Sequence, residues 1–259
     1  MGFLRRLLGL GRKEQSDSSR HASAASTAIA PALSTPSFPF PLVSVPGAEA
    51  VVAWRRYQTE WRKEGASAVV LGDADELKIR ADLLASEPVQ VSALLSAAAN
   101  TTAAAFFRAR EAEYIENELV VEPGQWPASA VPPSPLTAHT DVGSGQPKPV
   151  VYLAKIPTPH TWEVPAYLNA GGWNDCPDPA SQVAVLKYWH DKHGAEIYSL
   201  TGDVLECLVT RPPSTRQAAL ALAQEQFLFC ADVVHQGTES IEVLAATLLN
   251  SEVWYFWWD

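Results

Sequence analysis

An acidic pair on one expected helix is the first group of side chains that could do chemistry. Glu225 and Asp232 are seven residues apart, which places them two helical turns apart on one face, and Gln236 follows near the end of that helix. Two neighbouring carboxylates can act as a general acid and a general base. A solvated acidic face has the same pattern, and no histidine matches the spacing, so both interpretations stay open.

A glutamine on the same expected helix predicts a buried polar contact. Gln226 interrupts the apolar stripe between Ala223 and Cys230. A buried amide needs hydrogen-bond partners. We therefore expect the Gln226 side chain to bond to the backbone of a neighbouring loop and to specify the local packing.

The cysteines are the candidates for nucleophilic or metal chemistry. Cys176, Cys207 and Cys230 are an odd number at wide spacing, without a CxxC motif. Cys176 and Cys230 share their region with His190, His193 and His235. No Cys-His spacing marks a site, and a lone cysteine is commonly a small buried apolar residue. We expect free thiols in a reducing, cytoplasmic compartment, with no metal and no cofactor.

One loop could carry an aromatic side chain that binds a partner. Trp173 and Asn174 follow Gly171 and Gly172, and exposed aromatic side chains in such loops are common binding anchors. A tryptophan that packs over a helix cap would have the same sequence context, so this alternative is kept.

An arginine beside two prolines predicts an ion pair. Arg211 stands in a region with five basic residues against 13 acidic ones. We expect it to form a salt bridge with Glu206 or Asp203.

The closing stretch EVWYFWWD has the pattern of a strand with two apolar faces. Trp254, Phe256 and Trp258 alternate with Tyr255 and Trp257, and Asp259 follows. Neither face tolerates water. If helices cover one face, the N-terminal half of the chain or a partner protein must cover the other.

Residues 150–259 alternate between strand and helix patterns. Asp178 and Pro179 predict a helix start, Gly194 predicts its end, and Thr201-Gly202-Asp203 predicts a turn between two strands. The expected elements are a strand at 150–157, a helix at 179–193, a hairpin at 195–210, a helix from the capping box at Ser214 to Gly237, a helix at 239–250 and the closing aromatic strand. The order β-α-β-β-α-(α)-β predicts an α+β, ferredoxin-like fold with its helices on one face of an antiparallel sheet.

The rest of the chain divides into three parts. Residues 1–46 are a basic tail and a linker rich in Ala, Ser and Pro, which we expect to be flexible. Residues 47–121 predict a smaller α/β segment. It consists of a helix near 48–61, a strand at SAVVLGD, a helix at 77–84 and a helix at 101–118. Residues 122–149 are rich in Pro and predict a linker or a long surface loop.

Several motifs in this order are similar to a known family. GGWNDCPDP, YWHDKHGAE, GDVLE, RPPSTRQAALALAQEQFLFCADVVHQG and FWWD together resemble the bacterial DUF4253 family, a domain of unknown function, over residues 150–259. AVVLGDADEL is similar to a segment that often precedes that domain. The resemblance supports a domain boundary near residue 150 and implies no reaction.

The charge distribution excludes some partners. The formal net charge is −10, and the basic stripe of a nucleic-acid-binding protein is missing. There is no uninterrupted apolar run of about 20 residues, so no transmembrane helix is expected. Residues 1–13, MGFLRRLLGLGRK, are a frayed basic tail or an amphipathic segment that contacts a membrane surface.

These observations favour a non-enzymatic protein-binding module, such as an immunity or regulatory protein that masks a basic partner. The alternative is a small hydrolase or transferase with a carboxylate, His or Cys site between the two parts of the chain. The expected binding residues are Trp173, Asn174, Asp203, Glu206, Arg211, Glu225, Gln226, Asp232, Gln236, Trp257 and Asp259.

Overall fold

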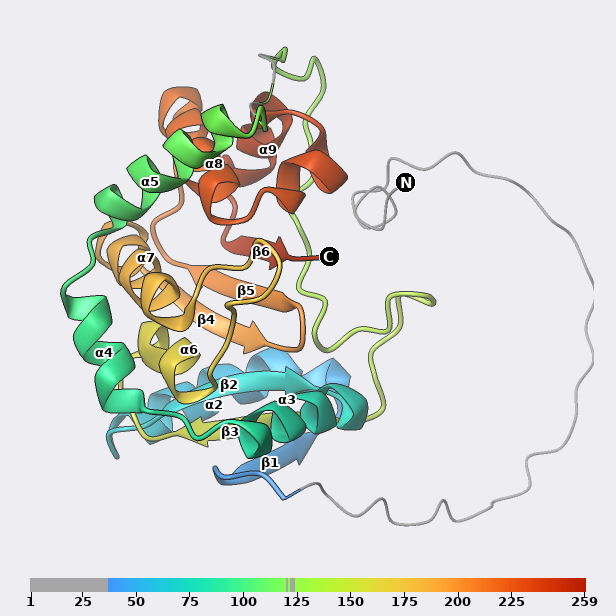
Figure 1. Ribbon diagram of the computed structural model, residues 1–259. Coiled ribbons are helices and arrows are strands. Elements are labelled where there is room, and N and C mark those ends of the chain that lie inside the picture. The colour runs from blue at the N-terminus through green and yellow to red at the C-terminus, as the bar shows by residue number, and fades with distance from the viewer. Residues whose placement is uncertain (1–36, 120, 122–123) are drawn as a thin grey trace, which may run out of the picture.

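One mixed sheet of six strands organises the protein (Figure 1). The structure is a computed structural model that describes residues 37–119, 121 and 124–259. The strands are β1 (Leu42–Val45), β2 (Ser67–Gly72), β3 (Val151–Ile156), β4 (Ala195–Leu200), β5 (Val204–Val209) and β6 (Val253–Trp257). Their order in the sheet is β1-β3-β2-β4-β5-β6, and only the β2-β4 pair is parallel.

The helices follow the same chain order. They are α2 (Ala50–Arg62), α3 (Ala74–Ser86), α4 (Val91–Ala99), α5 (Ala103–Glu116), α6 (Val164–Tyr167), α7 (Pro179–His193), α8 (Arg216–Phe229) and α9 (Ile241–Leu248). Short turns of helix occur at η1 (Gly47–Glu49), η2 (Thr161–Glu163) and η3 (Val233–Thr238). Among the described helices, none combines the length and the apolar character that crossing a bilayer requires.

A strand from the N-terminal region occupies the middle of the sheet. All six residues of β2 are buried, which fits a strand that is covered on both faces. Since β2 lies between β3 and β4, the regions before and after the Pro-rich segment share one sheet. Leu42–Val45, which we expected to be part of a flexible linker, forms the edge strand β1; residues 1–36 of that expected tail lie outside the described residues.

This arrangement shows an α+β fold and does not confirm the ferredoxin-like details. The strand at the carboxyl end, β6, pairs with β5 and not with β3, and β2 separates β3 from β4. A ladder between distant segments leaves no local signal in the sequence, so the order of elements alone could not reveal the inserted strand.

The closing aromatic stretch is a strand, as predicted. Trp254 and Phe256 are fully buried on the face covered by α7. There, the centroids of their rings lie 5.6 and 5.5 Å from the centroid of the Trp189 ring. Tyr255 is buried on the opposite face. The strand therefore contributes to cores on both sides of the sheet.

The second face of the sheet is covered by the chain itself. Trp54 of α2 donates a hydrogen bond from Nε1 to the Ala68 carbonyl at 3.0 Å, and it packs against Tyr198 of β4. Ala138, from the Pro-rich segment, joins the same apolar cluster. Of the two covers expected for this face, the N-terminal half of the chain is the one found here, because α2 packs on the face opposite α7. This part of the sheet is therefore an internal core and not a docking surface.

Capping residues set the ends of the most predictable helix. Asp178 accepts hydrogen bonds from the backbone N–H groups of Ala180 and Ser181 at the start of α7. Gly194 ends the helix with a φ of +63°, in the left-handed region that glycine tolerates best. Both ends agree with the prediction for residues 179–193.

The expected long helix from Ser214 to Gly237 is interrupted. Its N-cap is Thr215, and α8 ends at Phe229 because Cys230 adopts an extended backbone conformation. The Cys230 thiol donates to the Trp257 carbonyl at 3.0 Å, which ties the break to β6. Asp232 therefore follows the break and does not share a helix face with Glu225.

Candidate functional site

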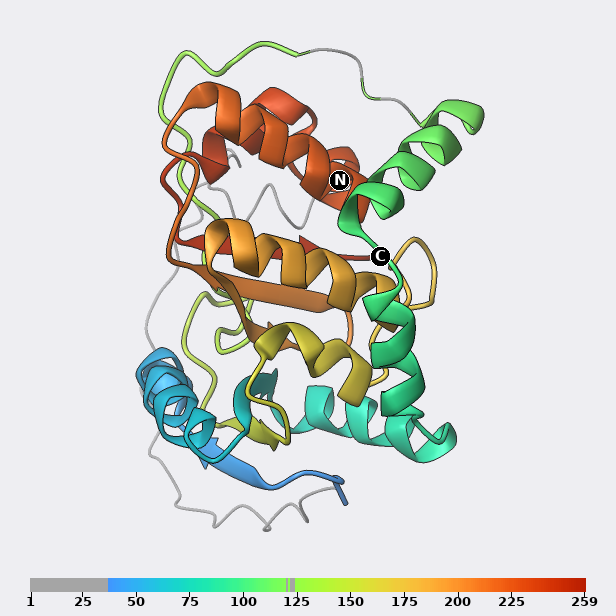
Figure 2. The ribbon, with the colours of Figure 1, turned by 90° about the vertical axis from the view of Figure 1, so that its left-hand side faces the viewer.

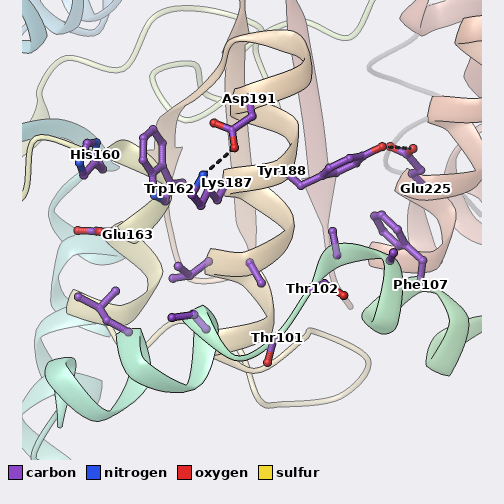
Figure 3. Close-up of a pocket in the computed structure, with 17 residues that line it drawn as sticks. Thr101, Thr102, Phe107, His160, Trp162, Glu163, Lys187, Tyr188, Asp191 and Glu225 are labelled. Atoms are coloured by element: carbon purple, nitrogen blue, oxygen red, sulfur yellow. Dashed lines mark hydrogen bonds and ion pairs between the residues drawn. The ribbon is translucent and has the colours of Figure 1, made fainter.

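An open groove of about 860 Å³ lies between α7 and the corner where α4 meets α5 (Figure 3). Its floor contains small apolar side chains, among them Ala98, Ala103, Val183 and Ala184. Figure 2 shows α4 and α5, in green, passing beside α7. One wall therefore belongs to the N-terminal region and the other to residues 150–259.

Local sequence determines the corner. The α4 helix ends at Ala99, and the Thr102 hydroxyl accepts a hydrogen bond from the Ala105 N–H at 3.1 Å to begin α5. Thr101 and Thr102 separate the two helices and lie at the mouth of the groove. Alanines line the groove on both α7 and the α4-α5 corner, and their small side chains leave it open, whereas larger side chains would fill it.

Polar contacts hold α5 in place beside the groove. The Arg110 guanidinium forms an ion pair with Asp175, and the Tyr114 hydroxyl donates to the same carboxylate at 2.7 Å. Arg110 Nε also donates to the Leu228 carbonyl at 3.3 Å. The N-terminal wall is thus attached to the Gly171–Cys176 loop and to the end of α8.

One end of the groove is aromatic. The rings of His160 and Trp162 stack at 4.3 Å with an interplanar angle of 19°, and His190 contacts the Trp162 ring at the same centroid distance. The Lys187 ammonium lies 5.7 Å from the centroid of that ring. These neighbours fix the Trp162 indole in place through stacking and a cation–π contact, and its partly exposed side chain lines the groove.

A fixed carboxylate occupies the other end (Figure 3). Glu225 accepts hydrogen bonds from the Tyr188 hydroxyl and from Trp189 Nε1, both at 2.9 Å, and from Lys192 Nζ at 3.0 Å. Burial raises the pKa of Tyr188, and the Glu225 carboxylate raises it further, although a hydrogen bond with Lys192 lowers it. The tyrosine therefore stays protonated and donates to Glu225 at neutral pH.

The groove is acidic overall. Glu163, Asp191 and Glu225 line it together with a single lysine, Lys187. Lys187 pairs with Asp191 at 2.6 Å, and the Thr158 hydroxyl donates to Glu163 at 2.5 Å. With Lys192, which pairs with Glu225 from beside the lining, three carboxylates face two ammonium groups and leave an excess of one negative charge.

The predicted loop residues meet at the turn between β4 and β5. Trp257 Nε1 donates to Asp203 at 3.2 Å, and the Asn174 amide donates to the Asp259 carbonyl at 2.8 Å. Trp173 is half-buried and packs against the main core. These five predicted residues therefore lie near one another, outside the groove.

The predicted acidic pair is separated. Asp232 accepts from the Gln236 amide at 2.9 Å and from the Asp259 N–H at 3.0 Å, whereas Glu225 contacts Tyr188 and its neighbours in the groove. The prediction that Glu225 and Asp232 share a face is wrong, because α8 ends between them. A hydrolase built on this pair loses its geometric basis.

Glu206 has a role that the sequence did not suggest. It is 0 % exposed on the face covered by α2, and burial raises its pKa. It accepts from the Thr137 N–H and hydroxyl, from the Ala138 N–H at 3.3 Å and from the Ser199 hydroxyl at 2.6 Å. Glu206 thus attaches the Pro-rich segment to the sheet.

The expected salt bridge of Arg211 is wrong. Its guanidinium donates instead to three carbonyls at the end of α7, those of His190 at 3.0 Å, Asp191 at 2.9 Å and Lys192 at 3.4 Å. Carbonyls at the end of a helix have no partner within the helix and carry partial negative charge, which makes them a good acceptor for a nearby cation. The Glu206 side chain lies on the face of the sheet opposite α7, where it already accepts four hydrogen bonds.

The expected hydrogen bond of Gln226 is also absent from the described part of the chain. The residue is buried, as predicted, yet neither polar atom of its side chain has a partner there.

The three cysteines are free and buried. Burial raises the pKa of Cys176 to about 12 and also raises that of Cys207 and Cys230. Thiolates are the reactive form, so these side chains are poor nucleophiles. Across residues 37–119, 121 and 124–259, no group of three or more His, Cys, Asp or Glu side chains is arranged to hold a metal ion.

This burial leads to a prediction for thiol chemistry. In the folded protein at pH 8, a disulfide reagent should label the three thiols at least about 100-fold more slowly than in denaturant, because labelling requires opening of the fold. Absorbance of the released thiolate measures both rates. Rapid labelling of one thiol under native conditions would show that a cysteine is accessible and activated.

Sequence reasoning did not find the residues that build the groove. His160, Trp162 and Glu163 occur in the stretch PHTWE, which has no periodic pattern, and α4 was not expected at all. Of the predicted binding residues, Glu225 alone lines the groove. The signal that could have found the site is the polar and aromatic content of a short turn that follows a buried strand.

The fold and the groove define a class: an α+β domain with a mixed sheet, covered on both faces, with an acidic groove beside its longest helix. Residues 152–259 match the family model described as Domain of unknown function (DUF4253), which is the family that the motifs resemble. Neither a curated protein nor a solved structure matches the chain. The β2 strand and the α4-α5 wall lie outside the matched residues.

Proposed function

We propose that the protein is a binding module that holds a basic, partly apolar segment of a partner protein in the groove. The observation that carries this proposal is the combination of an apolar floor, a flat Trp162 ring and an excess of carboxylates. An extended or helical peptide with Lys or Arg side chains and one aromatic or aliphatic anchor complements this lining.

Each part of the groove has a role in this proposal. The exposed part of the Trp162 indole contacts an apolar or aromatic side chain of the partner, and Glu163, which lines the groove beside it, attracts a Lys or Arg of the same segment. Glu225 supplies a carboxylate at the opposite end, which a cation of the partner shares with Lys192. Because Glu225 is already held by Tyr188 and Trp189, it is fixed in place before the partner arrives.

The biological use of such a module would be masking of a basic surface, as an immunity or regulatory protein does. Three free cysteines fit a reducing cytoplasm. The small hydrolase or transferase remains the alternative from the sequence, but the described site offers no convergent acid, base and nucleophile to support it.

Selection from a display library of random peptides tests the proposal. We expect the wild-type protein to enrich peptides with two or more Lys or Arg and one aromatic residue. Glu163→Gln combined with Glu225→Gln should weaken binding of the selected peptide by about 10-fold to 100-fold, since each lost charge contact contributes about 1 kcal/mol.

The controls separate groove binding from general attraction to an acidic protein. Glu252→Gln removes an exposed charge outside the groove lining and should change the affinity less than about 2-fold. Ala99→Trp fills the groove without changing the charge and should abolish binding. Enrichment of acidic or purely apolar peptides, or equal effects of all variants, would contradict the proposal.

A further inference from the structure

A buried arginine outside the groove has no counter-charge. Arg80 of α3 is 3 % exposed. Its guanidinium donates to the Leu168 carbonyl at 3.3 Å and to the Thr201 carbonyl, while Nε has no partner within the described chain. None of the ion pairs among the described residues includes Arg80. Burying an unpaired charge costs free energy, so an anion bound beside the Arg80 guanidinium would stabilise the folded protein.

The charge persists at neutral pH. Burial lowers the pKa of Arg80 to about 10, which still leaves the guanidinium protonated at pH 7. Burial also keeps the neighbouring Cys176 thiol protonated, since its pKa is raised to about 12. Cys176 therefore does not supply the missing negative charge as a thiolate.

A small cavity adjoins the guanidinium. It lies between the loop at 171–176 and the turn at 201–204, its lining includes Asp203, and its volume of about 10 Å³ is room for one small molecule or monatomic ion. Trp258 also lines it, and the Trp258 Nε1–H is buried without a hydrogen-bond partner in the described part of the protein. Two unused N–H donors, on Arg80 and Trp258, therefore belong to residues around one cavity.

The loop that closes the cavity depends on glycine. Gly171 has a φ of +94°, and a Cβ placed on it would lie 2.0 Å from the Pro177 carbonyl oxygen and 2.2 Å from Gln182 Nε2. The Gln182 amide in turn donates to the Ala170 and Pro177 carbonyls, both at 2.9 Å. Sequence and hydrogen bonding thus hold the loop against Arg80.

We propose that a single chloride-sized anion occupies this cavity and neutralises Arg80. A monatomic anion fits the volume, accepts hydrogen bonds from the free donors and pairs with Arg80, with which Asp203, the carboxylate of the lining, forms no ion pair among the described residues. Sulfate and phosphate are too large for the cavity. A water molecule is the competing occupant, because it could donate to Gln182 Oε1, which has no partner in the described chain, but water would leave Arg80 uncompensated.

Thermal unfolding of the full chain in different sodium salts tests this proposal. Replacing about 150 mM gluconate with chloride or bromide should raise the Tm by about 2–4 °C, because an anion that binds only the folded state stabilises it. Arg80→Met should remove this difference between salts. Arg216→Met, which removes an exposed arginine, should keep it.

Diffraction from crystals grown in bromide provides a second readout that does not depend on any variant folding. The proposal predicts an anomalous peak beside the Arg80 guanidinium. A water in the cavity without anomalous signal, together with a Tm that is the same in gluconate and bromide, would overturn it.

Discussion

Replacing Glu206 with alanine is expected to lower the free energy of unfolding by about 3 kcal/mol. The substitution leaves the N–H groups of Thr137 and Ala138 and the hydroxyls of Thr137 and Ser199 without their acceptor in a buried site. Relief from burying a carboxylate offsets part of this loss. Urea denaturation followed by tryptophan fluorescence measures the change.

The matched control is Glu252→Ala, which removes an exposed carboxylate just before β6 and should cost less than about 0.5 kcal/mol. If both substitutions have the same small effect, the Pro-rich segment is not attached to the sheet through Glu206.

Replacing Trp254 with alanine is expected to lower the free energy of unfolding by about 3–5 kcal/mol. The side chain is 0 % exposed and makes edge contacts with Trp189 at 5.6 Å and with His193 at 5.3 Å between ring centroids. Its removal leaves a cavity between β6 and α7. Equilibrium denaturation, with the slope against denaturant checked for two-state behaviour, measures the loss.

Trp257→Ala on the same strand is the comparison, since Trp257 is only partly buried and should cost less than half as much. Equal losses of unfolding free energy at the two positions would mean that packing against α7 does not dominate the stability of the closing strand.

Local signals were enough to predict much of the C-terminal region. Asp178, Pro179 and Gly194 mark the ends of α7 because capping depends on residues that are close in sequence. The alternation from Trp254 to Trp258 predicts β6 for the same reason: strand period is a local property.

The errors arose where distant parts of the chain meet. The position of β2 between β3 and β4 depends on a ladder between residues about 80 and 130 positions apart, such as Val70 with Leu153 and with Ser199. Arg211 donates to helix carbonyls and not to a carboxylate, because the hairpin places its side chain at the end of α7. Neither outcome is visible in composition or periodicity.

The interruption of α8 and the groove have a related explanation. The apolar stripe continues through Cys230, so periodicity alone extends the helix, while the contact between its thiol and Trp257 belongs to the tertiary structure. The groove depends on α4, an alanine-rich helix whose partners Ala166 and Val183 are about 70–90 residues away. Prediction of the site therefore required the fold.

Site-specific photo-crosslinking most directly tests whether the groove is the binding site. A benzophenone side chain at position 99, inside the groove, should form an adduct with a selected basic peptide, and excess unlabelled peptide should suppress it. The same probe at position 52, which is 74 % exposed on α2, should form none. Adducts at position 52 with none at position 99 would contradict the account.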